Sequence, residues 1–461
     1  MTPTASFERP AHSRYRWVVC GLLFFATTCN YLDRQVISYL KEFFCRPVAL
    51  GGFGWSDTDY GHLTGFFTLF YAGATIFAGW LMDRLGSKIG LALSLSIWSI
   101  FGIANAFVGR LVMMHILVRS AFGFGEGGNF PASIKTIAEW FPKRERAFAT
   151  AIFNSGSNFG PMVAAVLIPW IMVYFGDQRG WKMAFIITGA AGFIWLIFWF
   201  WLYETPERQR RLSQQEFDYI HVDDEAPRPA DVPVAPAPPA AAGKVPWSKL
   251  LTYRQTWAFF AGKFMTDGIW WFYLFWLPDY LQKQFGMTKQ QVTLPTFIVY
   301  GIAIVGSIYG GRVPFQLINR GMAVYKARMT TMFVIAIFPL AVLLTQYFGD
   351  VARFGHWSVF LAVGMICIGT TAHQAWSANL FTTVSDMFPK KSVASVIGIG
   401  TTGGGIGGFI VQLLPGALSV HFGGDAQKVY LVMFAICAFA YLIAWVIIKA
   451  LVPQHRPITD L

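Results

Sequence analysis

The sequence has few charged residues. Only 13% of its 461 residues are charged, whereas 55% are hydrophobic and 17% are aromatic. Soluble domains carry roughly 25% charged residues, so the composition excludes an ordinary soluble domain and predicts a polytopic membrane protein. Cysteine is scarce as well, and its spacing fits neither a disulfide framework nor a metal site, so no metal is expected. The cysteines are Cys20, Cys29, Cys45, Cys367 and Cys437.

Motifs of several other protein classes are absent. No G-x-x-x-x-G-K-[ST] phosphate loop occurs, which argues against a primary pump. No nucleophile, base and orienting group recur together, which argues against an enzyme. Gly123, Gly125 and Gly128 spell G-x-G-x-x-G, but no strand precedes them, so tight helix packing is the better interpretation. The first apolar run lacks a cleavage site and is expected to stay as a membrane anchor.

Twelve apolar windows are long enough to cross a bilayer, which takes about 20 residues each. We therefore expect an all-α membrane protein of twelve transmembrane helices, with both termini on one side. The windows are residues 17–40, 60–82, 89–108, 112–138, 147–174, 183–203, 255–281, 292–314, 327–347, 356–385, 393–420 and 429–451.

The net charge is +12, and the distribution of the basic residues along the chain fits a membrane topology. Lys and Arg are more than twice as frequent in the segments on the side of the termini as in those on the other side, so the positive-inside rule places both termini in the cytoplasm. We expect a bacterial inner membrane as the location and the lipid bilayer as a partner. Nothing further in the sequence favours a nucleic-acid partner.

The chain divides into two halves that repeat. Residues 204–250 are polar and include a Pro/Ala tract over 226–239, which is typical of an extended linker. We therefore expect a six-helix bundle over 1–203, a cytoplasmic linker over 204–250 and a second six-helix bundle over 251–461. The run E-W-F-P-K-R around Pro142 returns as D-M-F-P-K-K around Pro389, 247 residues later. An even number of spans separates the copies, so the repeat is parallel, a transporter plan with substrate held near the midplane.

The loop between the second and third windows carries a recognisable signature. Residues 79–88 read G-W-L-M-D-R-L-G-S-K, which closely resembles the cytoplasmic loop signature of the major facilitator superfamily. Its glycines suit closely approaching helix ends, and Asp83 and Arg84 are predicted to form a breakable gating latch.

Four ionisable residues lie deep inside two apolar windows of the first half. Asp33 and Arg34 interrupt the first window, where an ionised group costs about 2.5–3.5 kcal/mol, and such groups are functional by default. Arg119 and Glu126 lie seven residues apart in the fourth window, on one helix face. At 1.5 Å rise per residue, Asp33, Arg34 and Arg119 each lie about 10 Å from the outer end of their span and Glu126 about 10 Å deeper, so we expect all four to meet in one cavity. The alternative is a set of purely structural ion pairs.

The second half offers its own polar residues. Lys263 and Asp267 are spaced i,i+4 and can neutralise each other. That pair is expected to be structural, with a third titrating acid as the alternative. Trp270 and Trp271 suit stacking on a pyranose, although ordinary packing explains them equally well.

With the 247-residue offset of the repeat, His373 occupies the position equivalent to Glu126, so we expect it to face the central cavity. Hydrogen bonding of substrate by His373, Gln374 and Asn379 is favoured over a proton relay.

The resemblance extends to a narrower family. Residues 30–34, the Arg119/Glu126 pair, residues 139–142, residues 263–273 and residues 373–379 resemble the anion:cation symporter family, and within it the hexuronate transporters. This resemblance implies proton coupling by Asp33 and Glu126 and a grip on the substrate carboxylate by Arg34. We also expect Tyr31, Tyr71 and Arg119 to bind substrate.

A charge count supports proton coupling. Two acids and two arginines make the empty site neutral, so a bound uronate adds one negative charge that a dry cavity tolerates poorly. We predict a monomeric symporter that imports a hexuronate such as galacturonate or glucuronate, with the proton as coupling ion and no cofactor. Carriage of another organic anion (galactonate or an aldarate) and a non-transporting sensor stay as alternatives.

Overall fold

The computed structural model describes residues 13–222, 246–454 and 458, and within these residues it is built of helices without a β-strand. The amino-terminal half holds six long helical segments. They are α1 (Tyr15–Cys45), α2 (Asp57–Ala104), α3 (Val112–Glu126), α4 (Asn129–Trp140), α5 (Lys143–Phe175) and α6 (Asp177–Leu202), with the short helices η1 (Val48–Leu50) and η2 (Asn105–Phe107) between them.

The second half repeats this arrangement. Two short helices, α7 (Gln214–Ile220) and α8 (Trp247–Leu250), come between the halves. The second bundle comprises α9 (Arg254–Phe285), α10 (Thr293–Asn319), α11 (Val324–Ile337), η3 (Phe338–Leu344), α12 (Thr345–Phe348), α13 (Val351–Phe354), α14 (Trp357–Met387), α15 (Lys390–His421) and α16 (Ala426–Leu451).

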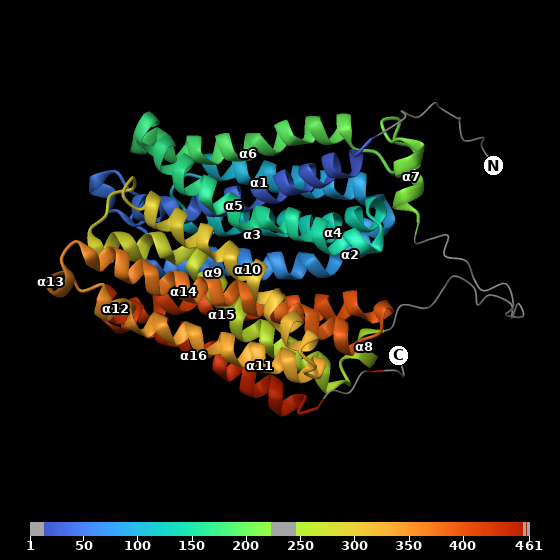
Figure 1. Cartoon of the computed structure of the whole chain (residues 1–461). Coiled ribbons are helices and arrows are strands. Elements are labelled where there is room, and N and C mark those ends of the chain that lie inside the picture. The colour runs from blue at the N-terminus through green and yellow to red at the C-terminus, as the bar shows by residue number, and fades with distance from the viewer. Residues whose placement is uncertain (1–12, 223–245, 455–457, 459–461) are drawn as a thin grey trace, which may run out of the picture.

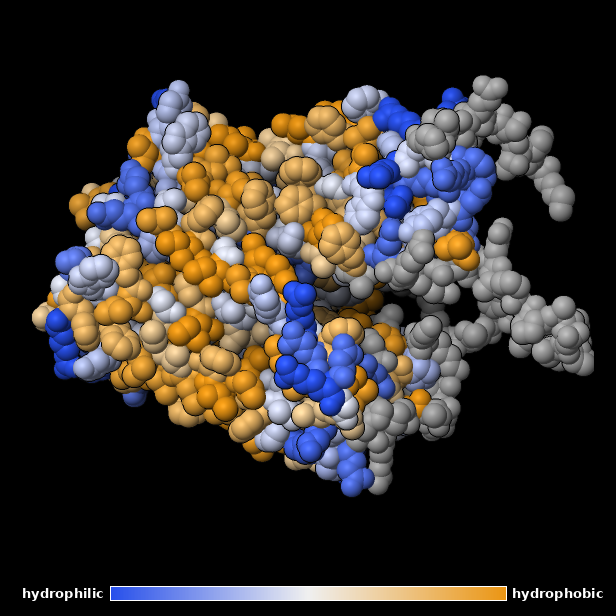
Figure 2. Space-filling view, in the orientation of Figure 1, coloured by the Kyte–Doolittle hydropathy of each residue, from blue (hydrophilic) through white to orange (hydrophobic). Residues whose placement is uncertain are grey.

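The long helices run roughly alongside one another, with α1–α6 in one lobe and most of the second-half helices in the other (Figure 1). Helices α7 and α8 lie at one end of the molecule, which we call the linker end. Helices α12 and α13 lie at the opposite end, the far end (Figure 1). On the face that Figure 2 shows, apolar residues dominate the middle and hydrophilic residues gather toward both ends, as expected for a protein that crosses a bilayer.

Eight helical segments in the described chain are long and apolar enough to cross a membrane by length and composition. The predicted spans outside this set are α1, the first part of α2, α3 with α4, and α9. Three of these four contain the predicted ionisable or polar site residues, and the first part of α2 contains Tyr71. In α1 and α9 polar side chains lower the mean hydropathy, whereas α3 (15 residues) and α4 (12 residues) are each too short to cross a membrane alone because the predicted span is divided.

Two glycine positions shape the first half. Gly86 has φ +73° and turns the chain between the two spans that α2 joins, inside the predicted loop signature. The predicted continuous span 112–138 is instead two helices, because Gly127 and Gly128 interrupt it. A Cβ on Gly127 would lie 2.7 Å from the Cβ of Ala74, and one on Gly128 would lie 1.9 Å from Ser94 Oγ. The glycine pair therefore lets this corner pack directly on α2.

The start of the predicted linker folds onto the first half. Glu216 of α7 accepts hydrogen bonds from the backbone N–H groups of Tyr15 (2.8 Å) and Arg16 (3.2 Å), which caps α1. Arg16 also forms an ion pair with Glu216 at 2.7 Å, and Tyr219 donates to Glu145 at 2.6 Å. Residues 204–222 thus move with the first bundle, whereas the Pro/Ala tract lies outside the described residues.

The halves touch mainly through α2 and α15. Small residues allow close approach from Thr58 beside Gly416 to Ala72 beside Gly405, in the stretch of α2 that begins at the far end. At the linker end the two lobes separate and a hollow opens between them (Figure 2). The molecule is therefore closed at the far end and open at the linker end.

Candidate functional site

The centre of the site is a dry ion pair between α1 and α3. Arg34 Nη2 lies 2.9 Å from Glu126 Oε2, Arg34 Nε donates to the same oxygen at 3.0 Å, and both side chains are at most 1% exposed. Asn30, one turn earlier on α1, accepts from Arg34 Nη2 at 3.2 Å. Glu126 is the last residue of α3, directly before the glycine pair, so the helix break fixes the position of its carboxylate. This confirms the predicted proximity of Arg34 and Glu126.

Arg119 joins this pair without contacting its carboxylate. Its Nη2 donates to the backbone carbonyl of Arg34 at 3.1 Å, and its guanidinium lies 4.3 Å from the ring centre of Phe122. Arg119 Nη1, Glu126 Oε1 and Asn30 Nδ2 are buried and have no hydrogen-bond partner in the described chain. Buried polar atoms are usually paired, so unpaired donors and an unpaired acceptor around one ion pair favour a site that binds a polar ligand.

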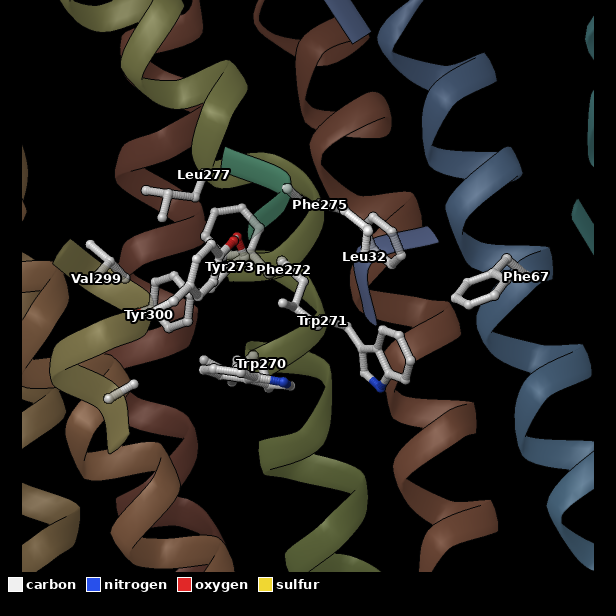
Figure 3. Close-up of a cluster of buried hydrophobic side chains, with 14 of the residues drawn as sticks. Leu32, Phe67, Trp270, Trp271, Phe272, Tyr273, Phe275, Leu277, Val299 and Tyr300 are labelled. Atoms are coloured by element: carbon white, nitrogen blue, oxygen red, sulfur yellow. The ribbon is translucent and has the colours of Figure 1, made fainter. Parts of the chain in front are cut away.

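Aromatic rings surround the Arg34 guanidinium. Its carbon lies 4.2 Å from the ring centre of Tyr31, 4.7 Å from that of Trp271 and 4.8 Å from that of Tyr71. We call these three rings the Arg34 cage. Tyr31 and Tyr71 come from the first half and Trp271 comes from α9 of the second, so the cage crosses the interface. Figure 3 shows Trp271 on the side of α9 that faces Phe67, with ring centres 5.9 Å apart.

Asp33 lies apart from this cluster. It is 2% exposed, and neither carboxylate oxygen has a hydrogen-bond partner in the described chain. Thr188 of α6 and Trp98 of α2, inside the first half, interact with its carboxylate. Consecutive helical residues point about 100° apart, so Asp33 faces its own bundle while Arg34 faces the interface. Three of the four predicted residues are therefore in direct contact, and Asp33 lies within electrostatic range of Glu126 and Arg119.

The predicted residues of the second half form a separate group. Trp270 stacks on His373 with ring centres 5.1 Å apart and planes at 6°, and Tyr441 hydrogen bonds His373 Nδ1 at 2.8 Å. Figure 3 places Trp270 near Tyr300, away from Trp271. Trp270 and Trp271 thus lie on different faces of α9, and only Trp271 reaches Arg34.

Gln374 and Asn379 differ in position. Gln374 accepts from Ser307 at 3.2 Å and donates to Asn158 of α5 at 3.4 Å, so it bridges the two halves. Asn379 is fully buried and donates to the backbone carbonyls of Gly310 (2.7 Å) and Ala375. The bond to Gly310 holds α14 against α10, so the structure gives Asn379 a packing role and does not bring it to Arg34.

Lys263 and Asp267 form the expected pair, 2.6 Å apart and mostly buried. Lys263 also lies 4.5 Å from the ring centre of Phe381. The Asp267 carboxylate is within electrostatic range of Tyr31 in the other half, so this pair lies beside the interface.

The predicted latch lies at the linker end of α2. Arg84 is exposed there, two residues before the Gly86 turn, and the side chain of Asp83 lies outside the described residues. Neighbouring bonds stabilise the loop: Ser87 donates to Glu139 at 2.6 Å. The gating role of the two residues stays a prediction.

A charged network at the far end was not predicted from the sequence. Lys41 of α1 is 1% exposed and lies 2.7 Å from Asp57 and 2.7 Å from Asp279 of α9. Lys283 of α9 lies 3.0 Å from Asp57 and 3.2 Å from Asp279, and Tyr430 donates to Asp279. These two lysines and two aspartates, the far-end network, connect the halves. Burial acts to raise the pKa of Asp57, but the Lys41 and Lys283 ammonium groups outweigh it and hold that pKa below its usual range.

A second group of ion pairs lies beside the network. Asp177, at the start of α6, lies 2.6 Å from Arg46 and 2.7 Å from Lys289 of the other half. These residues line a cavity of about 850 Å³ at the far end, together with Glu42 and Lys283. No short motif marks either group, because the partners come from distant segments. Only the position of charges at or just beyond the ends of apolar windows could have suggested them.

The fold and the sequence now identify the family. Residues 23–412 match the model of the Major Facilitator Superfamily, and the chain belongs to that superfamily. It is a multi-pass membrane transporter and not an enzyme, and the predicted all-α major facilitator fold is confirmed.

The chain is similar to several sugar acid transporters of this superfamily. The chain is 29% identical over 434 residues to the hexuronate transporter of Escherichia coli (strain K12), with 94% of each chain covered. It is 26% identical over 438 residues to the D-galactonate transporter of Escherichia coli O6:H1, covering 94% of this chain and 96% of the relative. A solved bacterial homolog of the human lysosomal transporter Spinster has the same fold, with a TM-score of 0.69, 17% identity and coverage of 95% and 98%.

Proposed function

We propose that this protein is a proton-coupled symporter that imports a sugar acid anion, with a hexuronate such as galacturonate or glucuronate as the substrate. The observation that carries the proposal is the dry Arg34–Glu126 pair inside the Arg34 cage, between the two halves. The names of the relatives support the substrate class. Galactonate, carried by a relative of similar coverage, is the second candidate.

The site has the groups that a uronate requires. Arg34 offers a guanidinium, which binds carboxylates through charge-assisted, bidentate hydrogen bonds. Tyr31, Tyr71 and Trp271 offer ring faces that suit the C–H face of a pyranose. Asn30 Nδ2 and Arg119 Nη1 are buried donors without a partner among the described residues, and they can reach hydroxyl or carboxylate oxygens of the ligand.

Proton coupling follows from the pairing. Glu126 holds Arg34, so a substrate carboxylate must compete with Glu126 for the same guanidinium. A proton on Glu126 removes its charge and frees Arg34 to bind the substrate. With both the uronate and the proton bound, the buried site carries no net charge, whereas a low-dielectric cavity would penalise an excess charge. Asp33 is proposed as a second proton carrier, from its position inside the first half.

Transport requires that the central site open alternately to the linker end and to the far end of the molecule. In this structure the far end is closed by the far-end network and the linker end is open (Figure 2). The excess of basic residues supports an orientation in which the linker end lies on the cytoplasmic side of a bacterial inner membrane. This state would therefore release substrate inside, and the network must separate before substrate can enter from outside.

Glu126→Gln tests the coupling, because glutamine keeps the shape and loses the charge. In proteoliposomes the variant should exchange labelled glucuronate with internal glucuronate but lose accumulation driven by a pH gradient. Asp218→Asn, on the helix α7 outside the site, serves as the matched control and should retain both activities. Full gradient-driven accumulation by Glu126→Gln would exclude Glu126 as the coupling acid. Absence of uptake by the unaltered protein, with ligand binding intact, would favour the sensor.

A further inference from the structure

A groove lies between α11 and α16, away from the proposed transport site. The groove has a volume of about 470 Å³ and opens at the linker end. The side chains that line it combine two lysines with aromatic and apolar groups: Tyr325, Lys326, Met329, Phe333, Trp445 and Lys449.

The groove carries positive charge that no acid among its described lining residues compensates. Its lining residues include Lys326 and Lys449 and no carboxylate. Lys449 Nζ donates to the backbone carbonyl of Pro453 at 2.8 Å and lies 4.8 Å from the ring centre of Tyr325, so its ammonium group keeps further donors. The nearby Asp386 is already paired with Arg328 at 3.0 Å. No described acid therefore neutralises the two lysines, and the groove suits an anion.

Bonds and ring contacts shape the groove. Trp445 donates to the carbonyl of Met329 at 3.0 Å, and its ring lies 4.8 Å from that of Phe333, which closes one side. Tyr325 donates to the carbonyl of Val452, which ties the end of α16 to the start of α11. The lysines are thus presented by connected helix ends, and the aromatic side chains separate them from the apolar surface beyond.

That apolar surface faces the bilayer. Val334 (47% exposed) continues α11 away from the lysines, and Val446 (58%) and Ile443 (47%) do the same on α16. An anion held at the lysines would have apolar side chains directly beside it, along the direction of lipid acyl chains. Basic pockets between membrane helices bind anionic lipid head groups on the same physical grounds.

We propose that this groove binds an anionic phospholipid, with its phosphate on Lys326 and Lys449 and its acyl chains on the exposed faces of α11 and α16. The occupant is a lipid, because the groove opens beside an apolar surface and a free anion would gain nothing from that surface. The site is independent of the proposed transport function, since none of its residues contacts Arg34 or the Arg34 cage.

The test compares matched double variants of the full chain. Purified protein is titrated with phosphatidylglycerol in a zwitterionic detergent, and bound lipid is counted by native mass spectrometry. Lys326→Gln with Lys449→Gln should weaken phosphatidylglycerol binding about thirtyfold, since each lysine near a lipid head group contributes about fivefold. Arg312→Gln with Arg320→Gln removes equal charge from exposed positions at the same end, outside the groove, and should leave binding unchanged.

Two further measurements keep the proposal falsifiable if the glutamine variant folds poorly. Lys326→Arg with Lys449→Arg should retain lipid, and the unaltered protein should retain phosphatidylglycerol well above phosphatidylcholine. Equal retention of the two lipids would overturn the proposal, as would equal losses in both glutamine double variants, the result expected of lysines that only follow membrane topology. Displacement of the lipid by millimolar inorganic phosphate would instead show a free-anion site and also overturn it.

Discussion

Arg34→Gln tests the site most directly, because it separates the structural role of the ion pair from its role in binding. The substitution leaves Glu126 buried at 0% side-chain exposure without a counter-charge. Removing one partner of a buried pair costs about 3–5 kcal/mol, mostly through the charge left behind. Replacing both partners removes that charge. Arg34→Gln combined with Glu126→Gln should therefore recover most of the lost stability.

Binding should respond differently from stability. Both the single and the double variant lack the guanidinium, so both lose a hydrogen bond to a charged group worth about 1.5–3 kcal/mol. Hexuronate affinity should then fall about 10- to 150-fold in each. Thermal unfolding in detergent reports stability, and equilibrium binding of radiolabelled glucuronate reports affinity. Arg353→Gln, which changes an exposed arginine of α13, is the control for both assays.

Two results would refute this reasoning. If Arg34→Gln unfolds at the same temperature as the unaltered protein, the Arg34–Glu126 pair does not have the dry environment that the structure shows. If the double variant is stable and still binds hexuronate with full affinity, another group holds the carboxylate, and Arg119 becomes the first candidate because its Nη1 is unpaired.

Two further predictions concern the cage and the far end. Trp271→Ala should weaken hexuronate binding about fivefold, since an aromatic contact of this kind is worth about 1 kcal/mol, while Trp271→Phe should keep most of the affinity; equal losses would argue against stacking on the sugar. The far-end network should stay closed from about pH 5 to 8, because Asp57 has a lowered pKa and its ion pairs are lost only as pH falls through that lowered value. Spin-label distances between α2 and α9 would measure this, and an opening near pH 6 would contradict it.

Much of the fold could be predicted because it depends on repeated, local signals. Apolar windows, the repeat of Pro142 at Pro389 and the glycine turn at Gly86 each mark a backbone feature within a few residues. The break after Glu126 was missed because a Gly-Gly pair inside an apolar run is equally typical of packing and of interruption. A Cβ on Gly127 would lie 2.7 Å from Ala74 of α2, so close packing requires glycine here. This contact joins two segments that are distant in the sequence, so the sequence of one segment cannot reveal it.

The site was predictable in its charges and less so in its geometry. Arg34, Arg119 and Glu126 stand out because charge is rare in apolar helices, and Arg34 and Glu126 do meet. Asn379 looked similar to its neighbour Gln374, but polar groups in a membrane helix also serve packing, and only the position of α10 shows that Asn379 bonds to Gly310. The far-end network is harder still, since Lys41 gains its partners only when the two halves come together.

The separation of Asp33 from Arg34 yields a last prediction. Asp33 contacts neither Arg34 nor the Arg34 cage, so a proton there can influence substrate only indirectly, through the packing of α1 against Thr188 and Trp98 and through its charge on Glu126 and Arg119. Asp33→Asn should therefore leave equilibrium binding of glucuronate within about twofold, because a neutral isostere at a site without direct contact changes little, yet abolish accumulation driven by a pH gradient. Glu126→Gln, which acts on Arg34 directly, should change both binding and accumulation. If the two variants change binding affinity equally, Asp33 and Glu126 share one site in solution and the separation of the two acids on α1 and α3 does not govern coupling.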